Sequence, residues 1–276
     1  MLNGLLALKK GRIELAIRDA VEQMRKEAKP FWLESVEKYL IQGNENIPNP
    51  GRFRPSSISP CARQNLFDYL GVARYSDHSL RTMKYFARGI ANQNIWEGIL
   101  RSSGLKLITP CSVCFQKGLT ECSHTHPQPW SKENPNVRGT PDIIIARQNG
   151  DIRNLEDLYL LEWKSTGYYR TEWAHYLQWQ LYSHFTGIKK GWIVNQDPNS
   201  WDTPYHDMEY NAKFVGQILE WLLFIQKCAE NKEMISIDER CGPGKKWDTK
   251  CEIYDFCHSK EASDPWSLPV ISNTAK

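Results

Sequence analysis

Two short apolar runs, each carrying an acidic residue, most constrain what this chain can fold into. Residues 139–145 read Gly-Thr-Pro-Asp-Ile-Ile-Ile, and residues 160–164 read Leu-Leu-Glu-Trp-Lys. Apolar stretches of this length are typical of buried strands. Because side chains alternate along a strand, Glu162 and Lys164 are expected on one face and Trp163 on the other. The chain therefore needs a sheet whose margin can hold two carboxylates and an ammonium group.

Helical patterns surround these two strands. We expect a strand at 191–194, strands at about 140–147 and 157–164, and helices at 11–42, 62–70, 79–103, 171–186 and 211–231. Gly71 and Gly187 are suited to end the helices before them. This order of helices, paired strands, helix and strand predicts an α/β core with helical additions.

The composition is that of an ordinary globular protein, with 41% hydrophobic and 24% charged residues. The net charge of +3 is too small to indicate nucleic acid by itself. No run reaches the roughly 18 apolar residues that a membrane span requires. In the first ten residues the charges follow the apolar stretch, the reverse of a secretory signal. We therefore expect a cytoplasmic protein that has no membrane partner.

The acidic pair and the lysine suit phosphodiester hydrolysis. A magnesium-like ion prefers oxygen ligands, commonly one or two carboxylates with water and substrate phosphate. Asp142 and Glu162 would supply the carboxylates, and the backbone carbonyl of Trp163 could add a third oxygen. Lys164 could orient or deprotonate the attacking water, or offset charge on the phosphorus. The alternative is a surface salt bridge at the strand ends.

The helix that follows adds Gln178 and Tyr182. These residues are four apart and therefore share one helix face. From there they could reach a DNA phosphate or base beside the metal. The alternative is that Tyr182 only packs against Trp179 and Phe185.

The ordered set Asp142, Glu162-x-Lys164 and Gln178-x3-Tyr182 resembles the PD-(D/E)XK nuclease superfamily. Within it, the set is similar to the RecB-like branch, which includes CRISPR-associated iron–sulfur exonucleases. The resemblance implies a restriction-endonuclease-like core, with a mixed central sheet flanked by helices. It also implies a metal on the two acidic residues, the lysine beside the attacking water, and the Gln/Tyr pair near the DNA.

The sequence departs from that family at one position. The family's upstream helix offers a His or a Glu four residues after a glycine, and here Gly89 is followed at that spacing by Gln93. A neutral amide is a poor ligand for magnesium. Glu97, one turn further along the helix, could substitute.

The resemblance also suggests a domain plan. Residues 1–55 would form an N-terminal helical segment and linker, residues 56–258 the nuclease domain, and residues 259–276 a tail. A stretch rich in cysteine and histidine, at about 110–127, interrupts the nuclease domain as an inserted loop.

Most of the eight cysteines are clustered, which in a reducing compartment favours metal over disulfides. By the family resemblance, one cysteine before the nuclease motifs and three after them would hold a [4Fe–4S] cluster. That set is Cys61, Cys241, Cys251 and Cys257. Separate free thiols or a zinc site are the alternatives.

The second cluster is Cys111-x2-Cys114-x7-Cys122, followed by His124 and His126. Three thiolates and one imidazole suit a structural zinc ion with tetrahedral geometry. Either histidine could complete the site, and a reduced surface loop is the alternative. Cys228 lies inside a helical pattern and is expected to be a small buried hydrophobic residue.

These observations predict a DNA nuclease that uses Mg²⁺ or Mn²⁺ and acts as an exonuclease on DNA ends or single strands. Proteins of phage recombination, of replication or of CRISPR adaptation are the expected partners, and self-association is left open. One alternative is a catalytically weak or inactive protein that binds DNA ends or serves as a scaffold. Another is an interaction protein organised by zinc on all of its cysteines.

Overall fold

The computed structural model describes residues 50–72, 80–147, 149–165, 172–197, 200–237, 241, 254–259 and 261–267. The chain divides into two units, Met1–Glu45 with His78–Tyr85, and Asn46–Asp77 with Phe86–Lys276. The helix expected over residues 11–42 belongs to the first unit and lies outside the described residues. The sheet and the candidate sites all lie in the second unit, and the domain boundaries of the sequence stay predictions.

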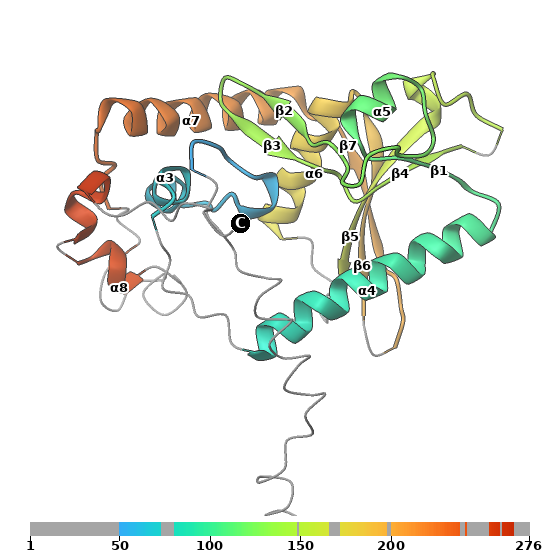
Figure 1. Ribbon diagram of the computed structural model, residues 1–276, viewed down its shortest axis with the longest axis horizontal. Coiled ribbons are helices and arrows are strands. Elements are labelled where there is room, and N and C mark those ends of the chain that lie inside the picture. The colour runs from blue at the N-terminus through green and yellow to red at the C-terminus, as the bar shows by residue number, and fades with distance from the viewer. Residues whose placement is uncertain are drawn as a thin grey trace, which may run out of the picture. The chain divides into compact units, whose positions relative to one another are not determined.

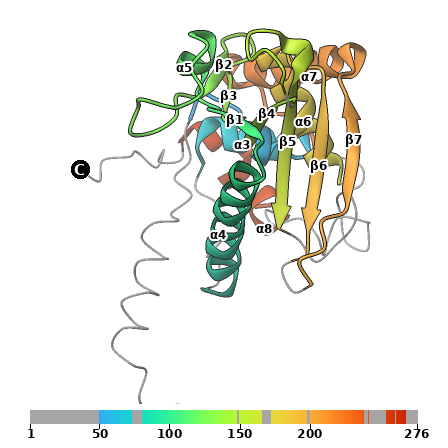
Figure 2. The same cartoon turned by 90° about the vertical axis from the view of Figure 1, so that its right-hand side faces the viewer.

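A five-stranded sheet forms the centre of the second unit (Figure 2). Its strands, in spatial order, are β1 (Lys106–Ile108), β4 (Ile143–Ala146), β5 (Leu158–Ser165), β6 (Lys190–Gln196) and β7 (Tyr205–Glu209). Strands β5 and β6 are parallel, and the other neighbours are antiparallel. A parallel pair needs a crossover connection, which here contains helix α6 (Trp173–Thr186). The mixed central sheet is therefore confirmed.

Helices cover both faces of this sheet (Figure 1). On one face, Trp179 of α6 is fully buried and its Nε1 donates to the carbonyl oxygen of Leu160 at 3.1 Å. On the other face, Trp96 of α4 (Leu80–Ser102) packs against Trp163 with ring centroids 5.1 Å apart. The α/β core flanked by helices is thus as the sequence predicted.

The remaining elements are short, with two exceptions. The longer helices are α3 (Ala62–Leu70) and α7 (Ala212–Asn231), which pack together with α6 around buried Leu66, Leu177 and Leu222. The short elements are η1 (Pro55–Ser57), α5 (Ser112–Gln116), β2 (Trp130–Lys132), β3 (Val137–Gly139), η2 (Leu155–Asp157), α8 (Tyr254–Cys257), η3 (Glu261–Ser263) and η4 (Pro265–Ser267). Strands β2 and β3 form a separate antiparallel pair.

Two helices end where their glycines predicted. Gly71 follows α3 with φ 72°, and Gly187 follows α6 with φ 81°. Both angles lie in the left-handed region, which glycine adopts without a steric cost. Across the part of the chain that is described, no helix has the length and apolarity that crossing a bilayer requires.

The C-terminal segment is attached to α3. The guanidinium of Arg63 donates to the carbonyl oxygens of Ile235, Cys257 and Ala262, at 3.1, 3.4 and 3.3 Å. Phe67 meets Phe256 edge to face, with ring centroids 5.0 Å apart. These contacts hold α8 and the segment at Ala262 beside α3.

Candidate active site

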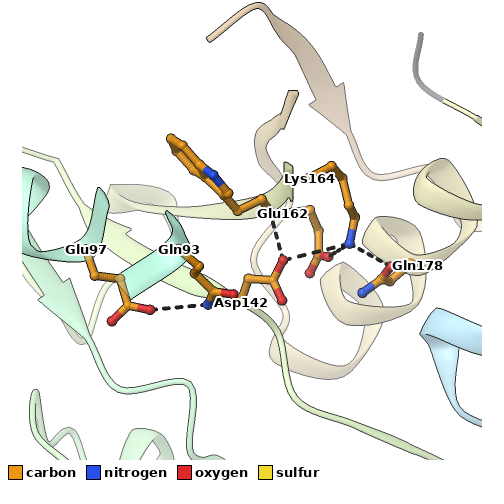
Figure 3. Close-up of polar contacts among 7 residues, drawn as sticks. Gln93, Glu97, Asp142, Glu162, Lys164 and Gln178 are labelled. Atoms are coloured by element: carbon orange, nitrogen blue, oxygen red, sulfur yellow. Dashed lines mark hydrogen bonds and ion pairs between the residues drawn. The ribbon is translucent and has the colours of Figure 1, made fainter. Parts of the chain in front are cut away.

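The pairing of β4 with β5 brings the predicted acidic residues together (Figure 3). Ile143 lies opposite Leu161, so Asp142, one residue before β4, reaches the middle of β5. The backbone N–H of Trp163 donates to Asp142 Oδ2 at 2.8 Å. Asp142 is thereby fixed beside the strand that carries Glu162 and Lys164.

Glu162 is fully buried. Its Oε2 accepts a hydrogen bond from Lys164 Nζ at 3.0 Å, whereas its Oε1 is buried without a hydrogen-bond partner among the described residues. Burial, and then the charge of Asp142, raise the pKa of Glu162 to about 8. An unpaired carboxylate oxygen at this depth is costly unless a cation accompanies it.

Lys164 connects the members of the site. Its Nζ donates to Glu162 and, at 3.0 Å, to Gln178 Oε1, and it lies 3.8 Å from Asp142 Oδ2. Burial lowers the pKa of Lys164, but the charges of Glu162 and Asp142 outweigh that effect, so the net pKa is raised. The side chain is therefore an ammonium at neutral pH, suited to orienting a water or offsetting charge rather than to accepting a proton.

This arrangement fits a magnesium-like ion. Asp142 and Glu162 present hard oxygens beside the middle of β5, and Glu162 Oε1 has no hydrogen-bond partner among the described residues. A bound divalent cation would reverse the effect of burial on the carboxylate and favour its ionised form. The carbonyl of Trp163 as a further ligand stays a prediction.

Gln93 and Glu97 line the same cavity as Asp142, a space of about 390 Å³ beside β4. Gln93 Nε2 donates to Glu97 Oε1 at 3.2 Å (Figure 3). Asn92, on the same helix, donates to the hydroxyl of Ser165 at the end of β5, at 3.0 Å. Helix α4 thus places Gln93 and Glu97 beside Asp142, and their role as metal ligands stays a prediction.

Gln178 and Tyr182 are both more buried than a DNA contact would suggest. Their side chains are 6% and 3% exposed. Gln178 accepts from Lys164, and Tyr182 lies against Gly139 so closely that a Cβ there would be 2.8 Å from its hydroxyl. Gln178 therefore supports Lys164 on β5 and Tyr182 packs against β3, and their contact with DNA stays a prediction.

One residue near the site was not predicted from the sequence. His175 lies three residues before Gln178 on α6, and this helical spacing was the signal that could have revealed it. Burial, and then the charge of Lys164, lower the pKa of His175, so the imidazole is neutral at pH 7. Its Nδ1 is buried with no hydrogen-bond partner in the described part of the chain.

A second cluster forms in the inserted loop. The ligand atoms of Cys111, Cys114, Cys122 and His124 all lie within 4.8 Å of one another. His124 Nδ1 is 3.5, 3.3 and 3.6 Å from the three sulfurs in that order, and the sulfurs of Cys114 and Cys122 are 3.9 Å apart. A tetrahedral zinc ion would place sulfur about 3.5 Å from nitrogen and sulfur about 3.8 Å from sulfur, given its usual bond lengths. The cluster therefore has the dimensions of a metal site.

The sequence left open which of two histidines completes the cluster. His124 lies in it, whereas His126 is exposed and outside it. Burial raises the pKa of the Cys111 thiol, but hydrogen bonds from backbone N–H groups, including that of Gln128, outweigh it and lower the pKa to about 6. A thiol so disposed to ionise suits a metal ligand.

The third group of cysteines is only partly described. Cys257 is buried on α8, which Arg63 ties to the helix that begins just after Cys61. Cys241 is half-buried, and Cys251 lies outside the described residues. Cys228 is 5% exposed within α7, as expected for a small hydrophobic residue.

Comparison with known proteins gives distant likenesses among solved structures. No protein-family model matches the chain, and no curated protein does. Among solved structures, SSO0001 aligns with a TM-score of 0.47 and 13% identity, over 84% of this chain and 98% of that one. The alkaline exonuclease LHK-Exo from Laribacter hongkongensis aligns with a TM-score of 0.40 and 12% identity, over 71% and 94%. Likenesses this distant do not establish a function, so a function can be inferred only from the geometry of the site.

Proposed function

We propose that this chain is a metal-dependent DNA nuclease. The observation that carries the proposal is the buried Glu162, whose Oε1 has no hydrogen-bond partner among the described residues, beside Asp142 and Lys164. Two carboxylates and an ammonium on adjoining strands are the groups that metal-assisted phosphodiester hydrolysis requires. The ordered resemblance to RecB-like nucleases, from Asp142 through Tyr182, supports the same conclusion.

Asp142 and Glu162 would hold Mg²⁺ or Mn²⁺, which when bound polarises the phosphate and lowers the pKa of water. Because Lys164 keeps its proton, it would donate a hydrogen bond that orients the attacking water. Its charge would also offset the negative charge that develops on the phosphate oxygens. Gln178 fixes the ammonium through the 3.0 Å hydrogen bond to its Oε1. The backbone N–H of Trp163 fixes Asp142, so both groups are oriented before substrate arrives.

The resemblance favours exonucleolytic action on DNA ends or single strands, with partners in recombination, replication or CRISPR adaptation. The competing function is a DNA-end-binding or scaffold protein that does not cleave DNA. The observation that favours it is Gln93, which stands where the resembling family has a His or a Glu. Glu97, which lines the cavity together with Asp142, favours the enzyme.

A cleavage assay separates these functions. End-labelled single- and double-stranded DNA is incubated with Mg²⁺ or Mn²⁺ and wild type, Asp142→Ala or Lys164→Ala. Loss of the metal ligand or the cation should slow cleavage by about 10²–10⁴-fold. Lys227→Ala, which removes an exposed charge from α7, is the matched control and should cut as wild type does. No cleavage by wild type, or equal cleavage by all four proteins, contradicts the enzyme.

We also propose two structural metal centres. Zinc would be held by Cys111, Cys114, Cys122 and His124, whose donor atoms have tetrahedral spacing and leave no open position for catalysis. A [4Fe–4S] cluster on Cys61, Cys241, Cys251 and Cys257 rests on the family resemblance. Arg63, two residues after Cys61, donates a hydrogen bond to the backbone carbonyl oxygen of Cys257. The described cysteines of this set do not form a group of ligand atoms close enough to hold one metal ion.

A further inference from the structure

A second cavity lies beside the candidate active site and is lined by three arginines. It has a volume of about 310 Å³, and Arg52, Arg54 and Arg138 contribute to its walls. Thr140 lines this cavity and also the one that contains Asp142. The two cavities therefore meet at the short segment between β3 and β4.

The backbone explains why these arginines converge. Phe53 pairs with Val137 as a parallel bridge, in which Phe53 N–H donates to the carbonyl oxygen of Asn136 at 2.7 Å and Arg138 N–H donates to that of Phe53 at 2.9 Å. Phe53 and Val137 are buried in the core. Because side chains alternate along extended backbone, Arg52 and Arg54 beside Phe53, and Arg138 beside Val137, point away from the core and line the cavity.

The described lining of this cavity is positively charged. It includes Arg52, Arg54 and Arg138 and no acidic side chain. Burial, and then the charges of Arg54 and Arg138, lower the pKa of Arg52. A bound anion would offset the repulsion that Arg52 experiences from the other two guanidinium groups. A guanidinium matches phosphate oxygens in shape and hydrogen bonding, so phosphate is the anion that this lining fits best.

Helix α6 contacts both the cavity and Lys164. Tyr182 lines it and presses on Gly139 of β3, where an added Cβ would be only 2.8 Å from the tyrosine hydroxyl. One turn earlier on the same helix, Gln178 holds Lys164. Gly139 and Asp142 are three residues apart, which limits their separation to about 11 Å. A strand phosphate in the arginine cavity would thus lie only a few nucleotides from one at the metal.

We propose that Arg52, Arg54 and Arg138 form a phosphate subsite, which holds the DNA strand that is cut and sets its register at the metal centre. This inference rests on the proposed nuclease function and deepens it by naming the part of the substrate that is held. The phosphate can be a terminal phosphomonoester or an internal phosphodiester, and both present the same oxygens to the arginines.

Binding measurements test the subsite. The affinity for a fluorescent single-stranded oligonucleotide is measured by anisotropy in Ca²⁺, over a range of salt concentrations, with the DNA confirmed intact afterwards. Arg52→Ala and Arg138→Ala should each bind about tenfold more weakly, as expected for a charged hydrogen bond. The slope of log affinity against log salt should become shallower by about one for each arginine that no longer neutralises a phosphate.

Two further variants control this result. Arg153→Ala removes an exposed arginine of the β4–β5 connection and should bind as wild type does. Arg138→Lys keeps the charge but loses the planar fork, so its affinity should lie between those of wild type and Arg138→Ala. Affinities and salt slopes of Arg52→Ala and Arg138→Ala equal to those of Arg153→Ala would overturn the subsite.

The oligonucleotides distinguish the two sources of phosphate. Four are compared: a 5′-phosphorylated strand, a 3′-phosphorylated strand, a strand with hydroxyl ends, and a circular strand. If the arginine variants lose affinity for only one of the phosphorylated strands, the subsite binds a terminal phosphate. If they lose affinity for the circular strand to the same extent, it binds an internal phosphate. Arginine-dependent binding by a wild type that cuts nothing contradicts the nuclease but keeps the subsite. Normal cleavage together with binding that does not depend on the arginines contradicts the subsite but keeps the nuclease.

Discussion

At the scale of single residues, the candidate site is organised around a buried carboxylate whose ionised form is costly. Glu162 is fully buried, and the Asp142 charge opposes its ionisation in the absence of a cation. Lys164 compensates one oxygen of Glu162 and leaves the other without a hydrogen-bond partner among the described residues. The fold therefore gives up stability at this position, as is common where a site is built for a ligand.

That cost predicts a pH dependence. The pKa of Glu162 is about 8 in the folded chain, above its ordinary value of 4.5, so between these values the folded state holds the extra proton. The stability from this group is complete below about pH 4.5 and is lost as the pH rises towards 8, by at most about 1.4 kcal/mol per pH unit. Urea unfolding without added Mg²⁺ or Mn²⁺ should show this loss relative to Glu162→Gln, which cannot titrate. A constant difference between the two proteins from pH 5 to 8 contradicts the assignment.

Gly139 gives a second prediction at this scale. An added Cβ would lie 2.8 Å from Tyr182 Oη and 2.9 Å from Pro55 Cδ, and neither neighbour is an exposed flexible chain end. Gly139→Ala should therefore lower the free energy of unfolding by about 1–3 kcal/mol. Gly98→Ala, on α4 with nothing within 4 Å, is the matched control and should raise it by about 0.5–1 kcal/mol. Equal effects in denaturant melts would argue against the close packing of β3 on α6.

The sequence predicted which residues meet at the candidate site better than it predicted their surroundings. Asp142, Glu162 and Lys164 lie in local patterns, so spacing and alternation were enough to bring them together. The arginine cavity joins Arg52 to Arg138 through one bridge between distant segments, and no local pattern carries that information. Tyr182 packs in one cluster with Trp179 and Phe185, as the alternative to a DNA contact expected, but its closeness to Gly139 of β3 was not predicted.

At the scale of elements, the long helices and apolar strands were predicted, and the short polar strands were not. Helix α6 and strand β5 have strong periodic patterns and clear boundaries. Strands β1, β2 and β3 have three residues each, too few to establish an alternation, and β7 is largely polar. These strands form because the sheet and the inserted loop supply their hydrogen-bond partners.

The geometry of the inserted loop predicts that His124, and not His126, binds zinc. Its residues Pro110 and Pro127 line the cavity of Asp142, so the loop shapes the entrance to the candidate active site. His124→Ala should lose the single zinc ion, whereas His126→Ala should retain it, because only His124 lies among the three thiols. Zinc per chain, measured by elemental analysis, decides this. Trp130 is buried, with its Nε1 bonded to the carbonyl oxygen of Pro110, and its fluorescence should shift on zinc loss. Equal zinc contents in the two variants contradict the site.

At the scale of the whole molecule, the start and the end of the second unit are held together by Arg63. Its three hydrogen bonds to carbonyl oxygens reach Ile235, Cys257 and Ala262. Arg63→Ala should free the C-terminal segment, because it leaves those acceptors without their charged donor. Limited proteolysis should then cut after residue 235 much faster than in wild type. Arg147→Ala, which removes an exposed arginine just after β4, serves as the control, and equal digestion of both variants contradicts this role of Arg63.

The proposed iron–sulfur cluster belongs to the same scale, since it would use cysteines from both ends of the domain. Anaerobically purified wild type should be brown, with absorbance in the visible range, and Cys61→Ser should lose that colour. Cys228→Ser, a cysteine outside both clusters, should keep it. A colourless wild type that contains only zinc contradicts the cluster, and leaves the catalytic proposal unaffected.

The central claim is that a metal on Asp142 and Glu162 contacts the phosphate that is cut. The most direct measurement replaces one non-bridging oxygen of a cleavable phosphate by sulfur, with each diastereomer tested separately. Mg²⁺ prefers oxygen, whereas Mn²⁺ accepts softer ligands more readily. We predict that one diastereomer is cut slowly in Mg²⁺ and that Mn²⁺ restores its cleavage. Equal slowing in both metals, or no slowing for either diastereomer, would contradict contact between the metal and the scissile phosphate.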